Sequence, residues 1–166
     1  MKANRYKSTF HTLDIGELLG TALQGSLTEE PALAKLVRVN TIIHTDLPPI
    51  RGDSLQLLEA FRNILVNALQ AMPDGGELTV ETVARELEKE VQVCIADTGT
   101  GIPAEHRSQI FEPFFTTKKR TRGGLGLSFA YRVVKSHSGR IDVQSSEQTG
   151  TTFTISLPVY EGTTAR

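Results

Sequence analysis

The segment that most constrains the fold is a long helical pattern from Asp53 to about Met72. Apolar residues recur at helical spacing along this segment, and the turn sequence at 73–76 (PDGG) ends it. Asp53, with Gln56 three residues later, has the form of a capping box that starts a helix. We therefore expect one long helix with a defined beginning and end.

The rest of the chain predicts shorter helices and several strands that are joined largely by hairpins. We expect helices at 14–23 and 125–137, a short helix within 103–110, and strands at 37–44, 77–84, 91–96, 140–145 and 151–157. The helices do not alternate one for one with the strands, which disfavours a doubly wound parallel sheet. The pattern favours a two-layer α/β (α+β) sandwich with about five strands packed against three helices.

Length and composition narrow the possible functions. A chain of 166 residues is expected to form one domain, here 13–159, between short segments at 1–12 and 160–166. It contains no apolar run long enough to span a membrane and no apolar leader, and its single cysteine, Cys94, cannot form an intrachain disulfide. We expect a cytoplasmic location without membrane contact. The 18 Lys and Arg against 19 Asp and Glu argue against a nucleic-acid partner.

Amide and acidic side chains form a stripe along one face of the long helix. With spacings of 3, 4, 4 and 3 residues, the stripe consists of Gln56, Glu59, Asn63, Asn67 and Gln70. Asparagine costs up to roughly 0.7 kcal/mol relative to alanine inside a helix, and solvated faces favour charged residues instead. Amide oxygens can ligate a hard cation such as Mg²⁺, which water and phosphate oxygens then complete. A merely solvated face is the alternative.

A glycine-rich turn follows the strand that ends at Asp97 (CIADTGTGIP). Gly99 and Gly101 permit a tight turn without side chains. The carboxylate could then accept a hydrogen bond from an amino group lying flat on the glycines, such as that of adenine. A solvent-facing β-turn is one alternative. A dinucleotide-binding turn is disfavoured, because the glycines follow the strand too late and Pro103 lies where the helix should begin.

Positive charge is concentrated around a second glycine-rich turn. Residues 116–140 contain seven Lys and Arg and no acid, and the turn at 123–128 (GGLGLS) begins a helix. The exposed N–H groups of a helix N-terminus attract anions, and glycines allow a lid-like movement. We expect a polyphosphate here, although not in a Walker-type loop, because no Lys-Ser or Lys-Thr follows the glycines. A solvated basic loop is the alternative.

The order of these motifs resembles the catalytic ATP-binding domain of bacterial sensor histidine kinases, in the superfamily shared with gyrase, MutL and a heat-shock chaperone. The resemblance covers roughly Leu13 to Val159. The segments RNILVNALQAM, DTGTGI, IFEPFFTTK, GGLGLS and TGTTFTISLP resemble the N box, first glycine box, F box, second glycine box and closing strand. The F box is similar to the nitrogen-regulator type. The resemblance implies the Bergerat fold, whose sheet is mixed and largely antiparallel.

The resemblance also implies a site for ATP and Mg²⁺. Asn63 and Asn67 would hold the metal and the phosphates, with Asn63 as the catalytic residue, and Asp97 would bind the adenine amine with support from Thr151. The other implied ATP-binding residues are Gly99, Gly101 and Ile102 in the first glycine box, Phe111 and Phe115 bracing a lid, and Lys118, Arg122, Gly124, Leu125, Gly126 and Leu127 near the phosphates.

The chain departs from the family pattern in four respects, the smallest of which is Thr100 where proline is common. Arg122 and Gly123 replace the usual Gly-Thr, so the family pattern does not identify the hinge residue of the lid. Arg122 could itself contact a phosphate. Gln70 replaces a common lysine. No histidine lies in an acceptor motif. The resemblance therefore implies the ATP-binding part of a kinase whose acceptor histidine, on a separate dimerisation domain, passes the phosphoryl group to a response regulator. Residues 1–12 resemble the tail of that domain's second helix.

Three other functions remain open. An ATP-hydrolysing clamp of the gyrase type would place a glutamate base where this chain has Asn63, and Glu59 lies a further helical turn away. A serine kinase of the anti-sigma type shares the nucleotide boxes, although the FEPFFTTK segment favours the sensor kinase. A domain that only binds nucleotide and reports it to a partner is the third.

Overall fold

Five strands form the main sheet of the computed structural model, which describes residues 9–116 and 125–162. In spatial order they are β2 (Val37–Ile42), β4 (Gly76–Arg85), β5 (Glu90–Asp97), β7 (Gly150–Pro158) and β6 (Arg140–Ser146). The β2–β4 pair is parallel and the other three pairs are antiparallel. The predicted mixed, largely antiparallel sheet is confirmed.

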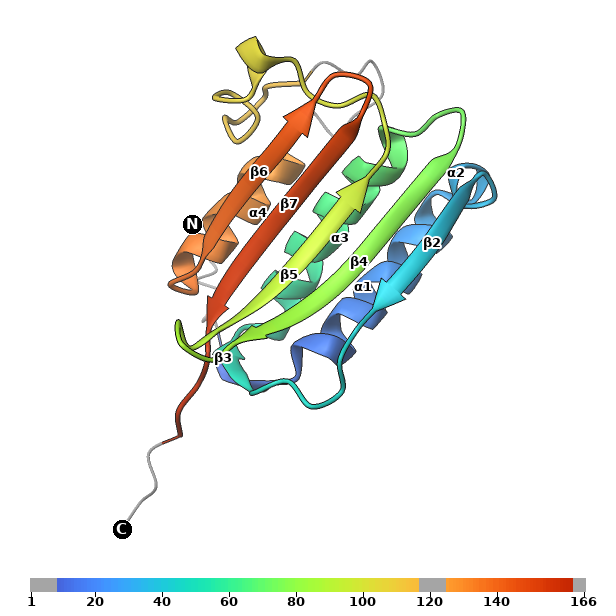
Figure 1. Cartoon of the computed structure of the whole chain (residues 1–166). Helices are drawn as coiled ribbons and strands as arrows, with labels where there is room; N and C mark the ends of the chain where they lie inside the picture. Colours follow the sequence, from blue (N-terminus) through green and yellow to red (C-terminus); the bar gives the residue numbers. More distant parts are fainter. Residues whose placement is uncertain (1–8, 117–124, 163–166) are drawn as a thin grey trace, which may run out of the picture.

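Helices cover one face of this sheet and leave the other face open (Figure 1). The three longer helices are α1 (Ile15–Glu29), α3 (Ser54–Gln70) and α4 (Gly126–Ser136). A short helix α2 (Pro31–Ala34) and a 3₁₀ turn η1 (Ala104–His106) complete the helical elements of the described residues. None of these helices has the length and apolar character that crossing a bilayer requires. The predicted two-layer sandwich is thus also confirmed.

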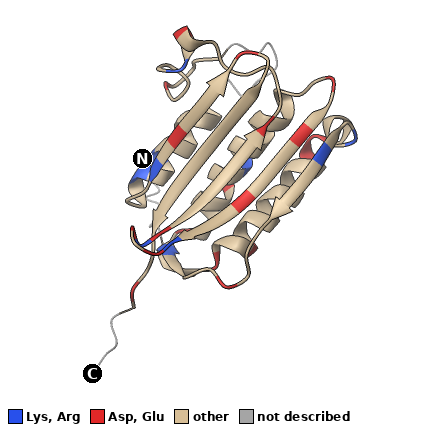
Figure 2. Cartoon of the chain, in the orientation of Figure 1, with Lys and Arg blue, Asp and Glu red and all other residues tan. Residues whose placement is uncertain are grey.

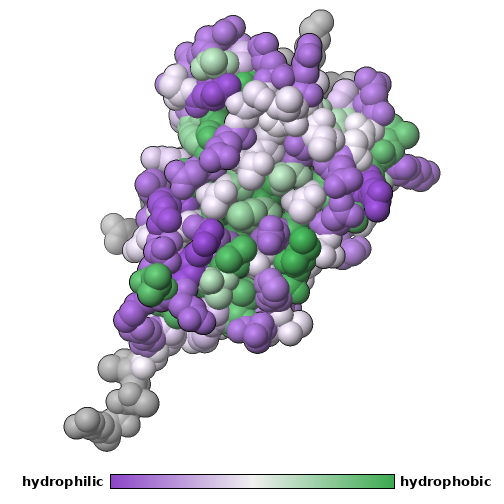
Figure 3. Space-filling view, in the orientation of Figure 1, coloured by the Kyte–Doolittle hydropathy of each residue, from purple (hydrophilic) through white to green (hydrophobic). Residues whose placement is uncertain are grey.

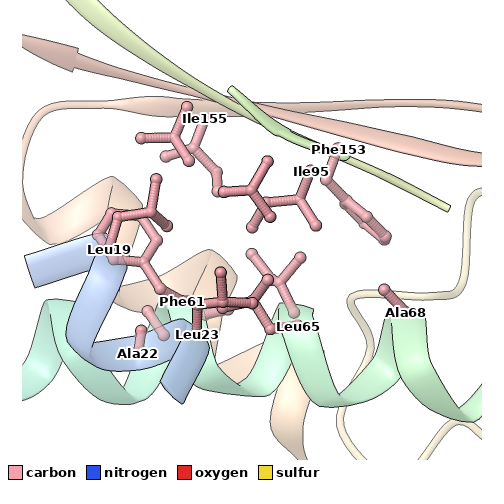
Figure 4. Packing of buried hydrophobic residues seen from close by; sticks show 14 of the residues in the cluster. Leu19, Ala22, Leu23, Phe61, Leu65, Ala68, Ile95, Phe153 and Ile155 are labelled. Atoms are coloured by element: carbon pink, nitrogen blue, oxygen red, sulfur yellow. The ribbon is translucent and has the colours of Figure 1, made fainter. Parts of the chain in front are cut away.

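The core lies between the helices and the sheet (Figure 4). Leu19 of α1 and Phe61 and Leu65 of α3 meet Ile95 of β5 and Phe153 of β7, and each is at most 1% exposed. Full burial of one such side chain contributes about 1.5–3 kcal/mol. The same contacts fix α3 along the middle of the sheet, so that its C-terminal end meets the end of β5.

Charged residues of both signs are scattered among uncharged ones on the open face of the sheet (Figure 2). Hydrophobic and hydrophilic residues alternate across it instead of forming one continuous apolar patch (Figure 3). Polar neighbours pair across the strands there: the Gln92 amide donates to the Ser156 hydroxyl at 3.2 Å, and the Cys94 sulfur lies 3.9 Å from the Thr154 hydroxyl. Every second residue of β5 points to this face, which explains the alternating burial along that strand.

Several predicted boundaries were wrong. Residues 11 and 12, expected at the tail of a helix, belong instead to strand β1 (His11–Leu13), whose backbone pairs with β3 (Ile50–Gly52). Residues 1–8 of that expected tail lie outside the described residues. Helix α1 continues six residues beyond its predicted end at residue 23. The expected helix within 103–110 is reduced to the single turn η1.

The predicted capping box at the start of α3 is only half formed. The Asp53 carboxylate accepts from the backbone N–H groups of Leu55 and Gln56, both at 3.1 Å. The N–H of Asp53 itself donates to Nε2 of His137, at 3.0 Å, instead of to the Gln56 side chain. Nδ1 of His137 lies 2.7 Å from the Val133 carbonyl and therefore carries the proton. This buried histidine ties the start of α3 to the end of α4.

Candidate functional site

A cavity of about 320 Å³ opens where the C-terminal end of α3, the end of β5 and the start of α4 meet. This volume lies within the range of small-molecule sites. Nine of the fifteen residues predicted to bind ATP line it: Asn63, Asn67, Asp97, Gly101, Ile102, Phe115, Gly126, Leu127 and Thr151. Segments far apart in the sequence therefore meet in one cavity, as the motif order predicted.

Asp97 and Thr151 lie at the buried base of the cavity. They are directly opposite each other on β5 and β7, and they are 5% and 4% exposed. Directly opposed residues have Cβ atoms about 4.5–5.5 Å apart. The N–H of Gly99 donates to Oδ1 of Asp97 at 2.9 Å, which orients the carboxylate. An ionised carboxylate only accepts hydrogen bonds, so this end of the cavity suits a ligand that carries an amino group.

The first glycine loop is fastened on two sides. The N–H of Thr100 donates to the carbonyl of Ala71 at the end of α3, and its carbonyl accepts from the N–H of Gln148, both at 3.0 Å. Gln148 lies in the turn between β6 and β7. These bonds hold the loop as one wall of the cavity.

Gly101 is required by the geometry of this loop, because its φ is +72° and an added Cβ would lie 2.0 Å from the Ser146 carbonyl oxygen. We expect Gly101→Ala to lower the free energy of unfolding by about 1–3 kcal/mol from backbone strain, with the steric clash adding to that cost. Gly126→Ala is the matched control: its Cβ would meet nothing closer than 3.6 Å, so its stability should change by about 1 kcal/mol or less. Urea denaturation measures both, and equal stability for the two variants would contradict this description of the loop.

The two asparagines form the opposite wall. Asn63 and Asn67 lie one helical turn apart on α3, and both line the cavity. Gly126 lies beside Asn63, since a Cβ on this glycine would be 3.6 Å from the asparagine Cβ. Helix α4 therefore begins next to the amides. Leu125 at its N-cap makes no side-chain capping bond, and the N–H groups of a helix N-terminus favour an anion.

The donor set of this wall fits Mg²⁺. Amide carbonyl oxygens are hard ligands, and Mg²⁺ usually binds few protein oxygens and keeps water and phosphate oxygens as its remaining ligands. Within residues 9–116 and 125–162, no group of three or more His, Cys, Asp or Glu side chains could hold a metal. Asn63 and Asn67 would hold a metal here together with the oxygens of its ligand.

Three predicted residues lie near the cavity without lining it. The ring centre of Phe111 lies 5.0 Å from that of Tyr131 on α4 and 6.3 Å from that of Phe153 on β7. These contacts anchor the F box to the core. Gly99 contacts the end of α3, and Leu125 is 42% exposed just before α4. The remaining three predicted residues, Lys118, Arg122 and Gly124, lie outside the described part of the chain, as does most of the basic cluster.

Sequence reasoning missed several lining residues: Val66, Ala71, Pro73, Thr100, Pro103, His106, Ile110 and Thr116. Helical spacing from Asn63 could have identified Val66, which lies three residues later on α3. Gln70 also lines the cavity; it belongs to the stripe but is not among the predicted ATP-binding residues. The Gln70 amide donates to the Glu30 carboxylate at 2.9 Å, so it is held toward α2. His106 packs edge-on against Phe115, with ring centres 5.4 Å apart, and no sequence pattern indicated this contact.

Glu59, the only carboxylate of the asparagine stripe, does not line the cavity. It pairs instead with Arg62 at 3.4 Å on the same helix. Among the described lining residues, Asp97 at the buried end of the cavity is the only carboxylate. The geometry thus offers no glutamate base beside the asparagines, which the gyrase-type hydrolytic clamp would require.

Comparisons with known proteins agree with this geometry. The family described as "Histidine kinase-, DNA gyrase B-, and HSP90-like ATPase" matches residues 52–161. Sporulation kinase A of Bacillus subtilis (strain 168) is 38% identical over 146 residues, which are 88% of this chain and 23% of that protein. The sensor histidine kinase ZraS of Escherichia coli (strain K12) is 35% identical over 147 residues, 89% of this chain and 30% of that protein. The chain thus spans less than a third of either relative.

Solved structures share the fold. The mycobacterial sensor histidine kinase MprB superposes with a TM-score of 0.76 and 27% identity, over 91% of this chain and 98% of that one. The catalytic domain of histidine kinase ThkA gives a TM-score of 0.77 at 24% identity, over 91% of this chain and 96% of that one. The family match, the sequence relatives and these folds agree with one another, and the chain belongs to the histidine kinase-, DNA gyrase B- and HSP90-like ATPase family.

Proposed function

We propose that this chain is the ATP-binding catalytic part of a sensor histidine kinase. The observation that carries the proposal is one cavity that has the Asp97 carboxylate at its buried end and two amides, Asn63 and Asn67, beside the start of α4. An asparagine occupies the position where a hydrolytic clamp would carry its base. The sequence relatives that are named as sporulation and sensor kinases support the same assignment. The nitrogen-regulator-like subtype of the F box remains a prediction.

In this proposal each wall of the cavity has its own role. Asp97 and Thr151 bind the adenine edge, with the glycine loop beneath the ring. The amides of Asn63 and Asn67 and the N–H groups at the start of α4 orient the phosphates toward the cavity mouth. When bound, Mg²⁺ would neutralise phosphate charge there. Phosphoryl transfer depends mainly on positioning and charge stabilisation, so no general base for water is needed.

The phosphoryl acceptor is proposed to lie on another domain. His137 is 4% exposed, and both its ring nitrogens are engaged in hydrogen bonds within the fold, so it cannot serve as the acceptor. The proposed partners are a dimerisation domain that carries the acceptor histidine and the receiver domain of a response regulator. The proposed location is cytoplasmic.

Phosphotransfer tests the proposal directly. The chain is incubated with Mg²⁺ and γ-labelled ATP, with and without a helical domain that bears an acceptor histidine. We expect acid-labile phosphohistidine on the added domain and very slow ATP hydrolysis in its absence. Acid-stable phosphoserine would favour the anti-sigma type, and rapid hydrolysis by the chain alone would favour the clamp. A chain that binds ATP but transfers nothing to any acceptor domain would favour a pure binding module.

A further inference from the structure

The hydroxyl group of Ser145 connects three segments at the base of the cavity. Ser145 lies on β6, directly opposite Thr151 on β7, which is itself directly opposite Asp97 on β5. The Ser145 Oγ accepts from the N–H of Ile102 at 2.8 Å, and it lies 3.0 Å from the Gly150 carbonyl and 2.8 Å from Oγ1 of Thr151. No motif in the sequence had drawn attention to this serine.

The number of protons in this network fixes the direction of each bond. A carbonyl can only accept, so the single hydroxyl proton of Ser145 goes to Gly150. The N–H of Ile102 occupies one lone pair of Ser145. The remaining bond therefore runs from the Thr151 hydroxyl, as donor, to the second lone pair of Ser145. Thr151 is left with only lone pairs to offer to a ligand, beside a carboxylate that also only accepts.

We propose that Ser145 is a positioning residue that sets the selectivity of this site for a purine with a 6-amino group over one with a 6-carbonyl group. The proposal rests on the proposed ATP-binding function. An amino group has two protons and can donate to both Asp97 and Thr151. Hypoxanthine could donate its N1–H to Asp97, but its carbonyl oxygen would face the Thr151 lone pairs. Without Ser145, the Thr151 hydroxyl could rotate and donate to that carbonyl.

The test compares the affinities for ATP and inosine triphosphate in the wild-type chain, Ser145→Ala and Ser146→Ala. The neighbouring Ser146 is exposed, and its side chain does not line the cavity, so this variant is the matched control. Loss of the Ile102 contact should weaken the binding of both nucleotides equally. Release of the Thr151 hydroxyl should instead change the ratio of the ATP affinity to the inosine triphosphate affinity. One hydrogen bond of about 0.5–1.5 kcal/mol corresponds to a roughly 2–13-fold change in affinity. We expect the ratio of ATP affinity to inosine triphosphate affinity to fall by about this factor in Ser145→Ala and to stay unchanged in Ser146→Ala.

A double-mutant cycle separates orientation of the hydroxyl from a general structural effect. In a Thr151→Val background, Ser145→Ala should leave the ratio of ATP to inosine triphosphate affinity unchanged, because no hydroxyl remains to orient. In the wild-type background, Ser145→Thr keeps the side-chain hydroxyl and should show the wild-type ratio of the two affinities. An unchanged ratio in Ser145→Ala, with ATP binding intact in the wild type, would overturn this inference alone. A wild-type chain that does not bind ATP would overturn the proposed function as well.

Discussion

Replacing Asp97 with asparagine should lower the affinity for ATP by about 100-fold or more. The substitution keeps the shape of the side chain and the oxygen that accepts from Gly99, so the loop should retain its conformation. It replaces a charged acceptor with an amide whose NH₂ group would face the amino group of adenine. Loss of one charge-assisted hydrogen bond, together with a buried unpaired donor, costs roughly 3–5 kcal/mol.

Calorimetry with ATP measures this effect, and thermal unfolding of the same samples checks that the fold is intact. Asp142→Asn is the matched control, since Asp142 is exposed on β6 and does not line the cavity. Asp142→Asn should bind ATP like the wild type. Equal ATP affinity in the two variants would show that adenine is not recognised at Asp97.

Replacing both Asn63 and Asn67 with alanine should remove the contribution of Mg²⁺ to ATP binding and lower the affinity in excess Mg²⁺ by about 10–100-fold. The physical reason is that the two amides are the proposed protein ligands of a metal whose other ligands come from water and phosphate. The alanine at position 63 keeps the Cβ that lies beside Gly126, so the start of α4 should stay in place.

The Mg²⁺ contribution is measured as the ratio of ATP affinities in excess Mg²⁺ and in excess chelator. The wild type should show a clear difference, whereas the double variant should bind equally under both conditions. Gln56→Ala, on the same stripe but outside the cavity, should behave like the wild type. A double variant that keeps the full Mg²⁺ effect would place the metal away from α3.

The sequence patterns predicted the elements whose neighbours in the chain are also their neighbours in space. The hairpins of β4 with β5 and β6 with β7 follow from strand alternation, and α3 from its period and its turn. The ribbon of β1 and β3 was missed because each strand has three residues and their pairing joins distant segments. The true partner of the Asp53 N–H was also missed, because His137 lies 84 residues away in the sequence.

For the candidate site as well, local sequence motifs indicated some of the residues that line the cavity, whereas the contacts from distant segments that position these residues could not be predicted. Residues within the motifs were found because their chemistry and order are local. The residues that position them lie in other segments of the chain: the Ala71 carbonyl bonds to the glycine loop, and the Ser145 hydroxyl bonds to Ile102 and Thr151. A serine in an edge strand has many ordinary uses, so its type and position alone carry no signal. Only the register of β5, β7 and β6 places it beside the base of the cavity.

A crystal structure of the chain with Mg²⁺ and a non-hydrolysable ATP analogue tests the central claim most directly. The account predicts that the adenine amino group lies within hydrogen-bonding distance of Asp97 and Thr151, with the metal on Asn63 and Asn67. A nucleotide bound anywhere else, or bound here with its base pointing away from Asp97, would contradict it.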